Sequence, residues 1–257
     1  MNSIPDKKLV VFDLDGTLAE SKSVVDAGMS DILGKLLEIK QVAVIGGGSH
    51  SQFTKQFLAG LKVPNELLPK LHLFPTCASQ YYYHEDGEWK EKYADRLTGE
   101  EKEKILSAFN ETFREHNYEH PEEVFGEIIE DRGTQITFSA VGQEAPVAKK
   151  QAWNEVKNSV RLAMAKTMKN KLAEFEVRTG GMTSIDVTRK GIDKAYGIRK
   201  IEELLGVPID HMIFVGDALY PGGNDEPVKQ AGVATIQVSG PEEVKKLIRE
   251  WLIDNKQ

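Results

Sequence analysis

The chain has a single cysteine, Cys77, among its 257 residues, and it has no long apolar run. One cysteine excludes an internal disulfide, and the residues around Cys77 lack the spacing of a metal-binding or catalytic thiol motif. A membrane-spanning helix needs about eighteen consecutive apolar residues, which occur nowhere, and the amino terminus enters an apolar strand without a signal-like stretch. These absences predict a cytoplasmic protein with no membrane partner.

The chain also has fewer basic than acidic residues. The chain carries 33 Lys and Arg against 40 Asp and Glu, which gives a formal net charge of -7. That balance argues against generic nucleic-acid binding, because a phosphate backbone attracts cationic surfaces. An anionic substrate would therefore depend on a few local cations or on a metal. The six histidines are scattered without the spacing of metal ligands.

What the chain does contain is an apolar run that ends in acids, LVVFDLDGTL at residues 9–18. An unbroken apolar run is typical of a central parallel strand, and ligands bind at the carboxyl ends of such strands. Because side chains alternate along a strand, Asp13 and Asp15 are expected to point the same way and to share one cation and one phosphate. Asp13 would attack phosphorus while Asp15 moves protons.

The alternative is a strand that merely ends in a turn, since Asp and Gly are common turn residues. A D-x-D-G-[ST] string arises by chance in only about half a percent of chains of this length, which favours the catalytic interpretation.

A second short apolar run, MIFVG at 212–216, also ends in an acid, Asp217. The Pro-Gly-Gly segment at 221–223 lets the chain turn back, so that Asn224 and Asp225 can approach the same place. Carboxylate and amide oxygens are ligands that Mg²⁺ accepts, together with substrate phosphate. An acidic surface loop is the alternative for this segment taken alone.

Together, DxDGT near the start and GDxxxPGGND near the end resemble the haloacid dehalogenase (HAD) superfamily of aspartyl-phosphate enzymes. The stretches FSAVGQ, GGMTSIDV, KGIDKAYGI and FVGDALYPGGND resemble its subclass IIB, which has a large α/β cap, and most of all the eukaryotic-type phosphomannomutase branch. The resemblance implies a covalent aspartyl phosphate on Asp13, acid/base catalysis by Asp15 and one Mg²⁺. The residues expected to hold that metal are Asp13, Asp15, Asp217, Asn224 and Asp225.

Two further positions match the family. A glycine-rich loop follows the apolar run QVAVI, and its Gly47, Gly48 and Ser49 are expected to offer N–H and hydroxyl groups to phosphate, although a flexible turn would look the same. The family also uses a lysine before the last part of its core, and Lys194 matches that position better than Lys190. The resemblance implies that this ammonium holds the nucleophile and the phosphate together.

The order of segments predicts an α/β fold, with a Rossmann-like HAD core built on a parallel sheet and an inserted α+β cap of the C2B type. The core would comprise residues 1–84 and 187–257. Residues 85–186 would form the cap, because helical stretches near 98–118 and 146–175 flank two β-like runs. The resemblance allows a homodimer that pairs through its caps.

The cap is expected to select the substrate. By resemblance, Arg132 matches a phosphate-facing arginine of the family, and Ser184 and Asp186 match substrate contacts. Gln143 stands where the family has an arginine, and an arginine upstream of Arg132 is missing. Glu20 and Lys22 occupy the region where the family's early arginine would be sought.

A mutase must retain a bisphosphate intermediate, and arginine serves this better than glutamine. The sequence therefore favours a Mg²⁺-dependent phosphatase acting on a small phosphorylated metabolite such as a sugar phosphate. Phosphomannomutase activity is the alternative. A catalytically silent binding domain is a remote third possibility, disfavoured because clustered acids repel one another without a metal.

Overall fold

The computed structural model describes residues 4, 6–20 and 23–254. The chain divides into two compact units, Met1–Ala94 with Ile192–Gln257, here called the core, and Asp95–Gly191, here called the cap. No helix among the described residues has both the length and the apolar character needed to cross a bilayer.

Both unit boundaries differ from the expected positions, 84/85 and 186/187. At the first boundary, β5 (Glu88–Ala94) pairs antiparallel with β4 (Gln80–Glu85) and so belongs to the core sheet. At the second, β9 (Ser184–Arg189) continues past residue 186 within the cap sheet. Strand pairing therefore moves the first boundary to the end of the β4–β5 hairpin and the second to just after the hairpin that β9 forms with β8 (Phe175–Gly180). The sequence pattern revealed neither hairpin.

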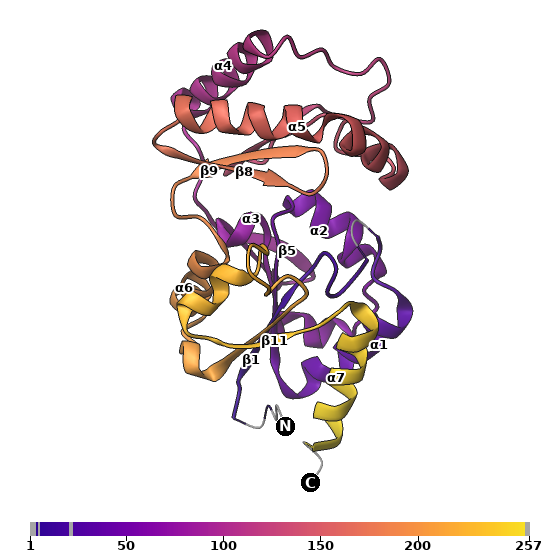
Figure 1. Cartoon of the computed structure of the whole chain (residues 1–257). Helices are drawn as coiled ribbons and strands as arrows, with labels where there is room; N and C mark the ends of the chain where they lie inside the picture. Colours follow the sequence, from indigo (N-terminus) through magenta and orange to yellow (C-terminus); the bar gives the residue numbers. More distant parts are fainter. Residues whose placement is uncertain (1–3, 5, 21–22, 255–257) are drawn as a thin grey trace. The chain divides into compact units, whose positions relative to one another are not determined.

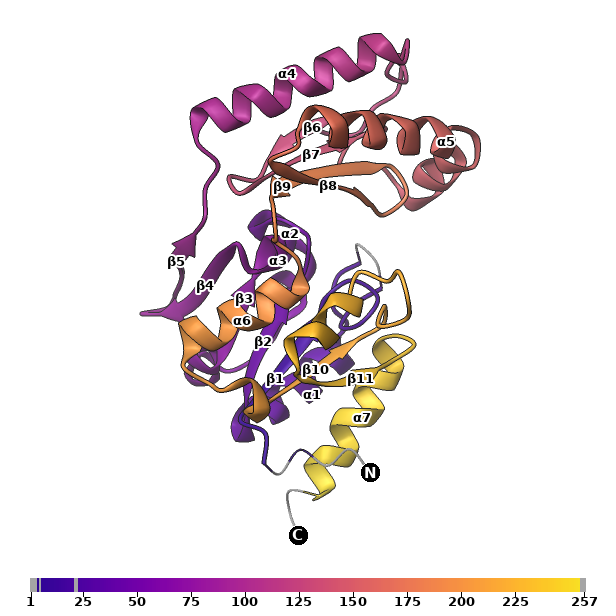
Figure 2. The same ribbon diagram turned by 60° about the vertical axis from the view of Figure 1, so that its left-hand side comes forward.

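The core contains a seven-stranded sheet in the order β11-β10-β1-β2-β3-β4-β5, visible in Figure 2. Its first five strands are parallel, and β4 and β5 add an antiparallel edge. Besides β4 and β5, the strands are β1 (Leu9–Asp13), β2 (Gln41–Ile45), β3 (Leu71–Phe74), β10 (Met212–Gly216) and β11 (Ala234–Gln237). This arrangement confirms the predicted α/β class with its parallel sheet.

Helices surround the sheet between successive strands (Figure 1). They are α1 (Ala27–Ile39), α2 (His50–Gln56), α3 (Pro75–Ala78), α6 (Lys194–Leu205) and α7 (Pro241–Asp254), with short 3₁₀ turns η1 (Leu58–Gly60), η2 (Asn65–Lys70), η3 (Ile209–His211) and η4 (Glu226–Ala231). The sequence pattern also predicts a helix near 191–205, a strand near 233–238 and a helix from Pro241, and these correspond to α6, β11 and α7.

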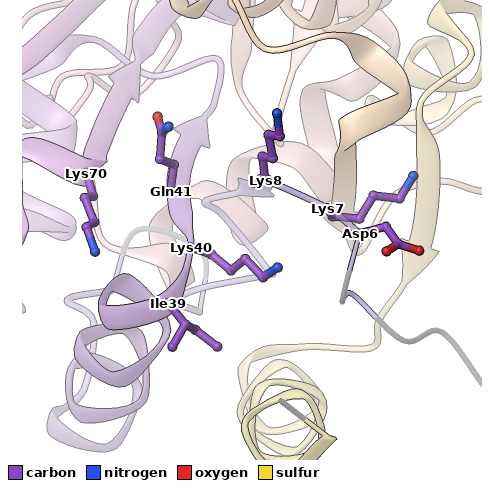
Figure 3. Close-up of a pocket in the computed structure, with 7 residues that line it drawn as sticks. All are labelled: Asp6, Lys7, Lys8, Ile39, Lys40, Gln41 and Lys70. Carbon is purple, nitrogen blue, oxygen red and sulfur yellow. The ribbon is translucent and has the colours of Figure 1, made fainter. Parts of the chain in front are cut away.

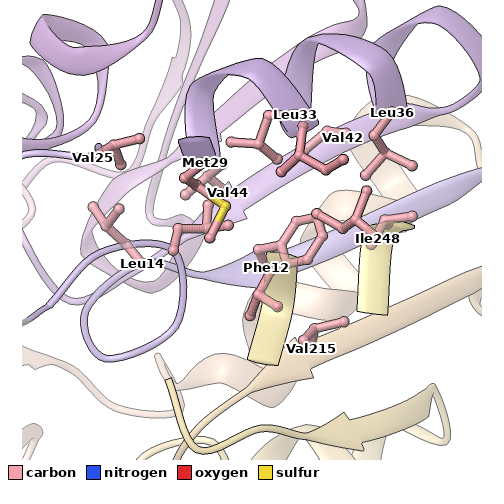
Figure 4. Packing of buried hydrophobic residues seen from close by; sticks show 14 of the residues in the cluster. Phe12, Leu14, Val25, Met29, Leu33, Leu36, Val42, Val44, Val215 and Ile248 are labelled. Atoms are coloured by element: carbon pink, nitrogen blue, oxygen red, sulfur yellow. The ribbon is translucent and has the colours of Figure 1, made fainter. Parts of the chain in front are cut away.

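The strand β1 is buried on both faces, as its unbroken apolar sequence predicts. Because side chains alternate, Val10 and Phe12 pack into one cluster with α1 and α7, part of which Figure 4 shows. Leu9 and Val11 pack into a second cluster, on the opposite face, which includes residues of α6. Helices thus cover both faces, which leaves the carboxyl ends of the strands as the place where polar side chains can gather.

The cap contains a four-stranded antiparallel sheet in the order β6-β7-β9-β8. Its elements are α4 (Gly99–Glu115), β6 (Ile129–Asp131), β7 (Gln135–Ser139), α5 (Val147–Lys171), β8 (Phe175–Gly180) and β9. The second of the two β-like runs predicted from the sequence, residues 176–187, forms the hairpin β8–β9, because a Gly-Gly turn divides it. A single apolar cluster joins this sheet to α4 and α5. The residues that alternate with it along β7 and β9 are polar, namely Gln135, Thr137, Ser139, Ser184, Asp186 and Thr188.

The helix α7 supplies a sharp test of the core packing. Trp251 is 2% exposed in the cluster with α1, whereas Ile253 on the same helix is 60% exposed. We expect Trp251→Ala to lower the free energy of unfolding by about 3–5 kcal/mol, because it leaves a cavity. The matched change Ile253→Ala should stay within about 0.5 kcal/mol of the parent. Urea denaturation followed by circular dichroism measures both, and equal losses would contradict the packing described.

Candidate active site

Three carboxylates converge at the carboxyl ends of two neighbouring strands. Asp13 ends β1, Asp217 follows β10, and Asp225 precedes η4 after the Pro-Gly-Gly turn. The parallel pairing of β1 with β10 brings the first two together. One oxygen from each of the three lies within 4.8 Å of the others. The structure thus assembles three of the five acids and amides predicted from sequence.

A buried lysine lies among these carboxylates. Lys194, the first residue of α6, is 2% exposed, and its Nζ donates to Asp13 Oδ1 at 2.5 Å and also to Asp225 Oδ1. The second Asp225 oxygen accepts the N–H of Ala218 at 3.0 Å. The helix begins here because the Asp193 side chain caps it by accepting the N–H of Tyr196. Lys194 was assigned by resemblance alone, and its position beside Asp13 agrees with that assignment.

The charges in this cluster do not balance. Burial raises the pKa of the Asp13 carboxyl to about 7; Lys194 opposes the rise and Asp225 adds to it. Burial raises the pKa of Asp217 too, with the Asp225 charge as the next cause. For Lys194, burial alone would lower the pKa, but its two carboxylate partners outweigh burial and keep the ammonium charged. Three acids thus face one ammonium, which leaves an excess of negative charge.

The donor set fits a hard divalent cation. Asp13 Oδ2 is buried and has no hydrogen-bond partner among the described residues. An unsatisfied buried carboxylate oxygen is costly, and a cation within reach would remove that cost. The oxygens that could hold Mg²⁺ with it belong to Asp217 and Asp225, and all-oxygen coordination is what Mg²⁺ prefers.

Two glycines make room for these carboxylates. A Cβ built on Gly16 would lie 2.7 Å from Asp217 Oδ2, and the residue has φ +83°, which also favours glycine. A Cβ on Gly216 would lie 2.4 Å from Asp225 Oδ2. The glycine of the DxDGT motif therefore serves the second acidic segment as well as its own turn.

Asp15 and Asn224 differ from the expectation. Strand β1 ends at Asp13, so side-chain alternation does not extend to Asp15, and its carboxylate accepts hydrogen bonds from Gln52 and Gln56 of α2 instead. The structure does not place it in the group formed by the three other acids. Asn224 is exposed in its loop.

The glycine-rich loop lies between β2 and α2, as expected. Ser49 caps α2 by accepting the N–H of Gln52 at 3.4 Å. Two carbonyls of the loop, those of Gly46 and Gly48, accept the N–H groups of Cys77 and Thr76 at 2.9 and 3.0 Å. These donors belong to α3, whose residues Thr76 and Cys77 adopt left-handed backbone angles. The loop carbonyls are thus held by α3. A built Cβ on Gly47 has no neighbour within 4 Å, so that side of the loop is open.

In the cap, the predicted substrate residues form a connected polar row on the sheet. Arg132 Nε donates to Glu130 at 2.7 Å, and its Nη2 donates to Gln143 Oε1 at 3.3 Å. Asp186 Oδ1 accepts a hydrogen bond from the Thr137 hydroxyl at 2.8 Å. The two residues are paired between β9 and β7, and Ser184 is paired with Ser139 in the same ladder. The structure therefore brings Arg132, Gln143, Ser184 and Asp186 together on β7, β9 and their flanks. Glu20 is exposed in the core, and Lys22 lies outside the described residues.

Sequence reasoning missed two buried cations of the cap. Lys150, in the first turn of α5, is 3% exposed, and its Nζ donates to the main-chain oxygen of Gln143 at 3.0 Å. Arg161 is 6% exposed and donates to the main-chain oxygens of Gly180, Gly181 and Ser184. A lysine or arginine on a helix ordinarily has its charged end in solvent, so pattern alone gave no signal for either.

A surface recess lies at the opposite end of the core sheet. Its volume is about 360 Å³, and Figure 3 shows its lining residues, Asp6, Lys7, Lys8, Ile39, Lys40, Gln41 and Lys70. These residues lie just before β1, at the junction of α1 with β2, and just before β3, at the amino ends of the strands. The recess is therefore remote from Asp13, and we assign it no part in the chemistry.

Comparison with known proteins places this geometry in context. Residues 29–254 match the family described as eukaryotic phosphomannomutase. Phosphomannomutase 1 of Mus musculus is 28% identical over 225 residues, which cover 86% of this chain and 82% of that protein. The phosphomannomutase of Encephalitozoon cuniculi is 27% identical over 253 residues, 96% of this chain and 94% of its own.

Solved structures share the fold at lower identity. An IMP-nucleotidase of Plasmodium falciparum superimposes with a TM-score of 0.71 at 15% identity, over 97% of this chain and 70% of that one. A haloacid dehalogenase-like hydrolase of Bacteroides thetaiotaomicron gives a TM-score of 0.60 at 16% identity, over 95% and 99% of the two chains.

The buried ammonium gives a test that does not depend on turnover. We expect Lys194→Met to lower the free energy of unfolding by about 3–5 kcal/mol in EDTA, because removing one partner leaves buried carboxylates uncompensated. Added Mg²⁺ should recover part of that loss, since the metal binds the folded state. Urea unfolding in EDTA and in Mg²⁺ measures this.

The exposed neighbour Arg199, changed to Met, provides the control on the same helix. A Lys194→Met variant as stable as the control in EDTA would mean that the ammonium does not compensate the acids.

Proposed function

This chain belongs to the eukaryotic phosphomannomutase family, and from that premise we propose that it moves the phosphoryl group of a hexose phosphate through an aspartyl phosphate on Asp13. The observation that carries the proposal is the Lys194 ammonium, which contacts both Asp13 and Asp225 while the second Asp13 oxygen has no hydrogen-bond partner among the described residues. One carboxylate oxygen is thereby held in place and the other is available to a metal or to phosphorus.

The residues of the site divide the chemical steps in this proposal. Asp13 Oδ attacks phosphorus, so that a carboxylate–phosphorus bond forms as the bond to the sugar oxygen breaks. Asp15 gives its proton to the leaving oxygen and takes one back from the attacking hydroxyl in the second transfer. Lys194 holds the nucleophile and the phosphate charge, and the N–H groups of Gly47, Gly48 and Ser49 cradle the phosphate. Mg²⁺ held by Asp13, Asp217 and Asp225 would neutralise charge on the transferring group.

We further propose that the second transfer goes to a sugar hydroxyl, as in phosphomannomutase, and not to water. The sequence alone favoured a phosphatase, because Gln143 replaces an arginine of the family. Two observations support the mutase more strongly. The curated relatives named phosphomannomutase match across nearly the whole chain. Lys150, which the sequence did not single out, adds a buried cation beside Gln143.

Hydrolysis is the second candidate, and one observation favours it. Glu130 accepts from Arg132 at 2.7 Å and offsets its charge, and Gln143 is neutral. A cap with so few uncompensated cations would hold a bisphosphate weakly, which gives water time to discharge the aspartyl phosphate.

A phosphorus NMR time course separates the two candidates. The protein is supplied with Mg²⁺ and mannose 1-phosphate or glucose 1-phosphate, with and without the sugar 1,6-bisphosphate, and Asp13→Asn is the blank. We expect conversion to the 6-phosphate that depends on the bisphosphate, with little free phosphate. Release of phosphate without any 6-phosphate would establish hydrolysis and contradict the mutase. No reaction of either kind would contradict both.

The charges of the cap are expected to set the ratio of conversion to the 6-phosphate over release of free phosphate. Changing Lys150 to Met removes a charge-assisted contact of about 1.5–3 kcal/mol, so we expect the bisphosphate to bind about 10- to 100-fold more weakly and a larger share to be hydrolysed. Gln143→Arg should act in the opposite direction. The exposed Lys149, changed to Met, is the control. The ratio of 6-phosphate to free phosphate measures the effect, and a ratio unchanged in both variants would exclude these residues from binding.

A further inference from the structure

Two amide side chains contact the proposed proton-transfer residue. Gln56 Nε2 donates to Asp15 Oδ1 at 2.8 Å, and Gln52 Nε2 donates to Asp15 Oδ2 at 3.2 Å. Both carboxylate oxygens therefore have a donor from the same helix, α2. Neither glutamine figures in any motif, since amides on a short helix carry no sequence signature of their own.

The two amides also support each other. They stand four residues apart, which places them on one face of α2, and Gln52 Nε2 donates to Gln56 Oε1 at 3.1 Å. Gln56 is 4% exposed, so its amide must find partners inside the protein. Between them, Phe53 is fully buried in the core and anchors the helix. The amide pair is therefore fixed by packing and not by solvent-exposed contacts.

The glycine-rich loop at residues 46–49 packs against the Gln52 amide. A Cβ built on Gly48 would lie 2.4 Å from Gln52 Oε1, so a side chain at this position would require the Gln52 amide to move from its present place. The absence of a side chain at this position thus makes room for the Gln52 amide, in addition to any approach by phosphate. The loop that is expected to hold phosphate and the residues that hold Asp15 are parts of one packed unit.

We propose that Gln52 and Gln56 are positioning residues that hold the Asp15 carboxylate in the orientation from which it transfers protons. This rests on the proposed function, in which Asp15 serves the leaving and attacking oxygens. The need for such a device follows from the fold: Asp15 lies beyond the end of β1, where no strand pairing orients its side chain. A displacement of about 1 Å in a catalytic group can cost about 100-fold in rate, which is the scale on which two fixed donors matter.

A purely structural role for the pair would have a different consequence. If the amides only anchored α2, their loss would disturb the phosphate loop and weaken every reaction at Asp13 alike. If they act through Asp15, their loss should slow only those steps that need a proton transferred. The leaving group distinguishes these cases, because nitrophenolate departs without protonation whereas a sugar oxygen requires it.

The experiment compares Gln56→Met and Gln52→Met, which keep side-chain length and remove the amide, with the parent protein and with Asp15→Asn. In Mg²⁺, rapid-quench measurement follows the first-turnover release of nitrophenolate from 4-nitrophenyl phosphate. Steady-state conversion of mannose 1-phosphate, or of glucose 1-phosphate, follows the step that needs the proton. Ser51→Ala, on the exposed side of α2, is the matched control.

We expect the nitrophenolate burst to stay within about threefold of the parent, with kcat for the sugar phosphate lowered about 10- to 100-fold and KM little changed. Gln56→Met should show the larger loss, because its hydrogen bond is the shorter and its side chain the more buried. The half-buried Gln52 provides the second variant where Gln56→Met does not fold.

Equal losses of burst and turnover in the glutamine variants would overturn the proposal in favour of a structural role, and so would unchanged turnover. Failure of the proposed function looks different: the parent would then show no burst, and Asp15→Asn would turn over as the parent does.

Discussion

The contact of the Lys194 ammonium with Asp13 and Asp225 is the interaction on which the rest of the structure depends. Its three residues come from the first strand, the helix that follows the cap, and the loop after β10, and all three are at most 2% exposed. A buried cation is tolerated only when its partners are in place, and the same holds for each buried carboxylate. The core therefore reaches its low-energy state only when the residues proposed for catalysis have been assembled.

That constraint explains features that look unrelated in the sequence. Gly16 and Gly216 lie 200 residues apart, yet each leaves space for a carboxylate of the second acidic segment. The backbone N–H of Ala218 satisfies the Asp225 oxygen that Lys194 does not contact. The two glycines thus both provide space for a carboxylate from the second acidic segment, and Gly16 also meets the backbone requirement of its own turn.

The sequence predicted what arises from long apolar runs and from motif resemblance, namely β1, β10, the α/β class and the position of Lys194. It did not predict the β4–β5 hairpin, because β5 is largely exposed and polar and so resembles a loop. Alternation gives no basis for the direction of Asp15, since β1 ends at Asp13, and its contacts with Gln52 and Gln56 were not predicted. Lys150 and Gln56 were missed because residue type on a helix does not reveal burial, and Gln52 because it does not reveal a contact with Asp15.

In the proposed function the core supplies the nucleophile, and the cap supplies charges that would retain the substrate. Transfer to a hydroxyl and transfer to water use the same nucleophile, so nothing about Asp13 or Lys194 distinguishes a mutase from a phosphatase. The distinction depends on how long the unreacted end of a bisphosphate is retained, and retention depends on cations. In this chain Arg132 pairs with Glu130 and Gln143 is neutral, while Lys150 and Arg161 are buried cations of the same unit, so under the proposed function any such retention would draw on these few charges.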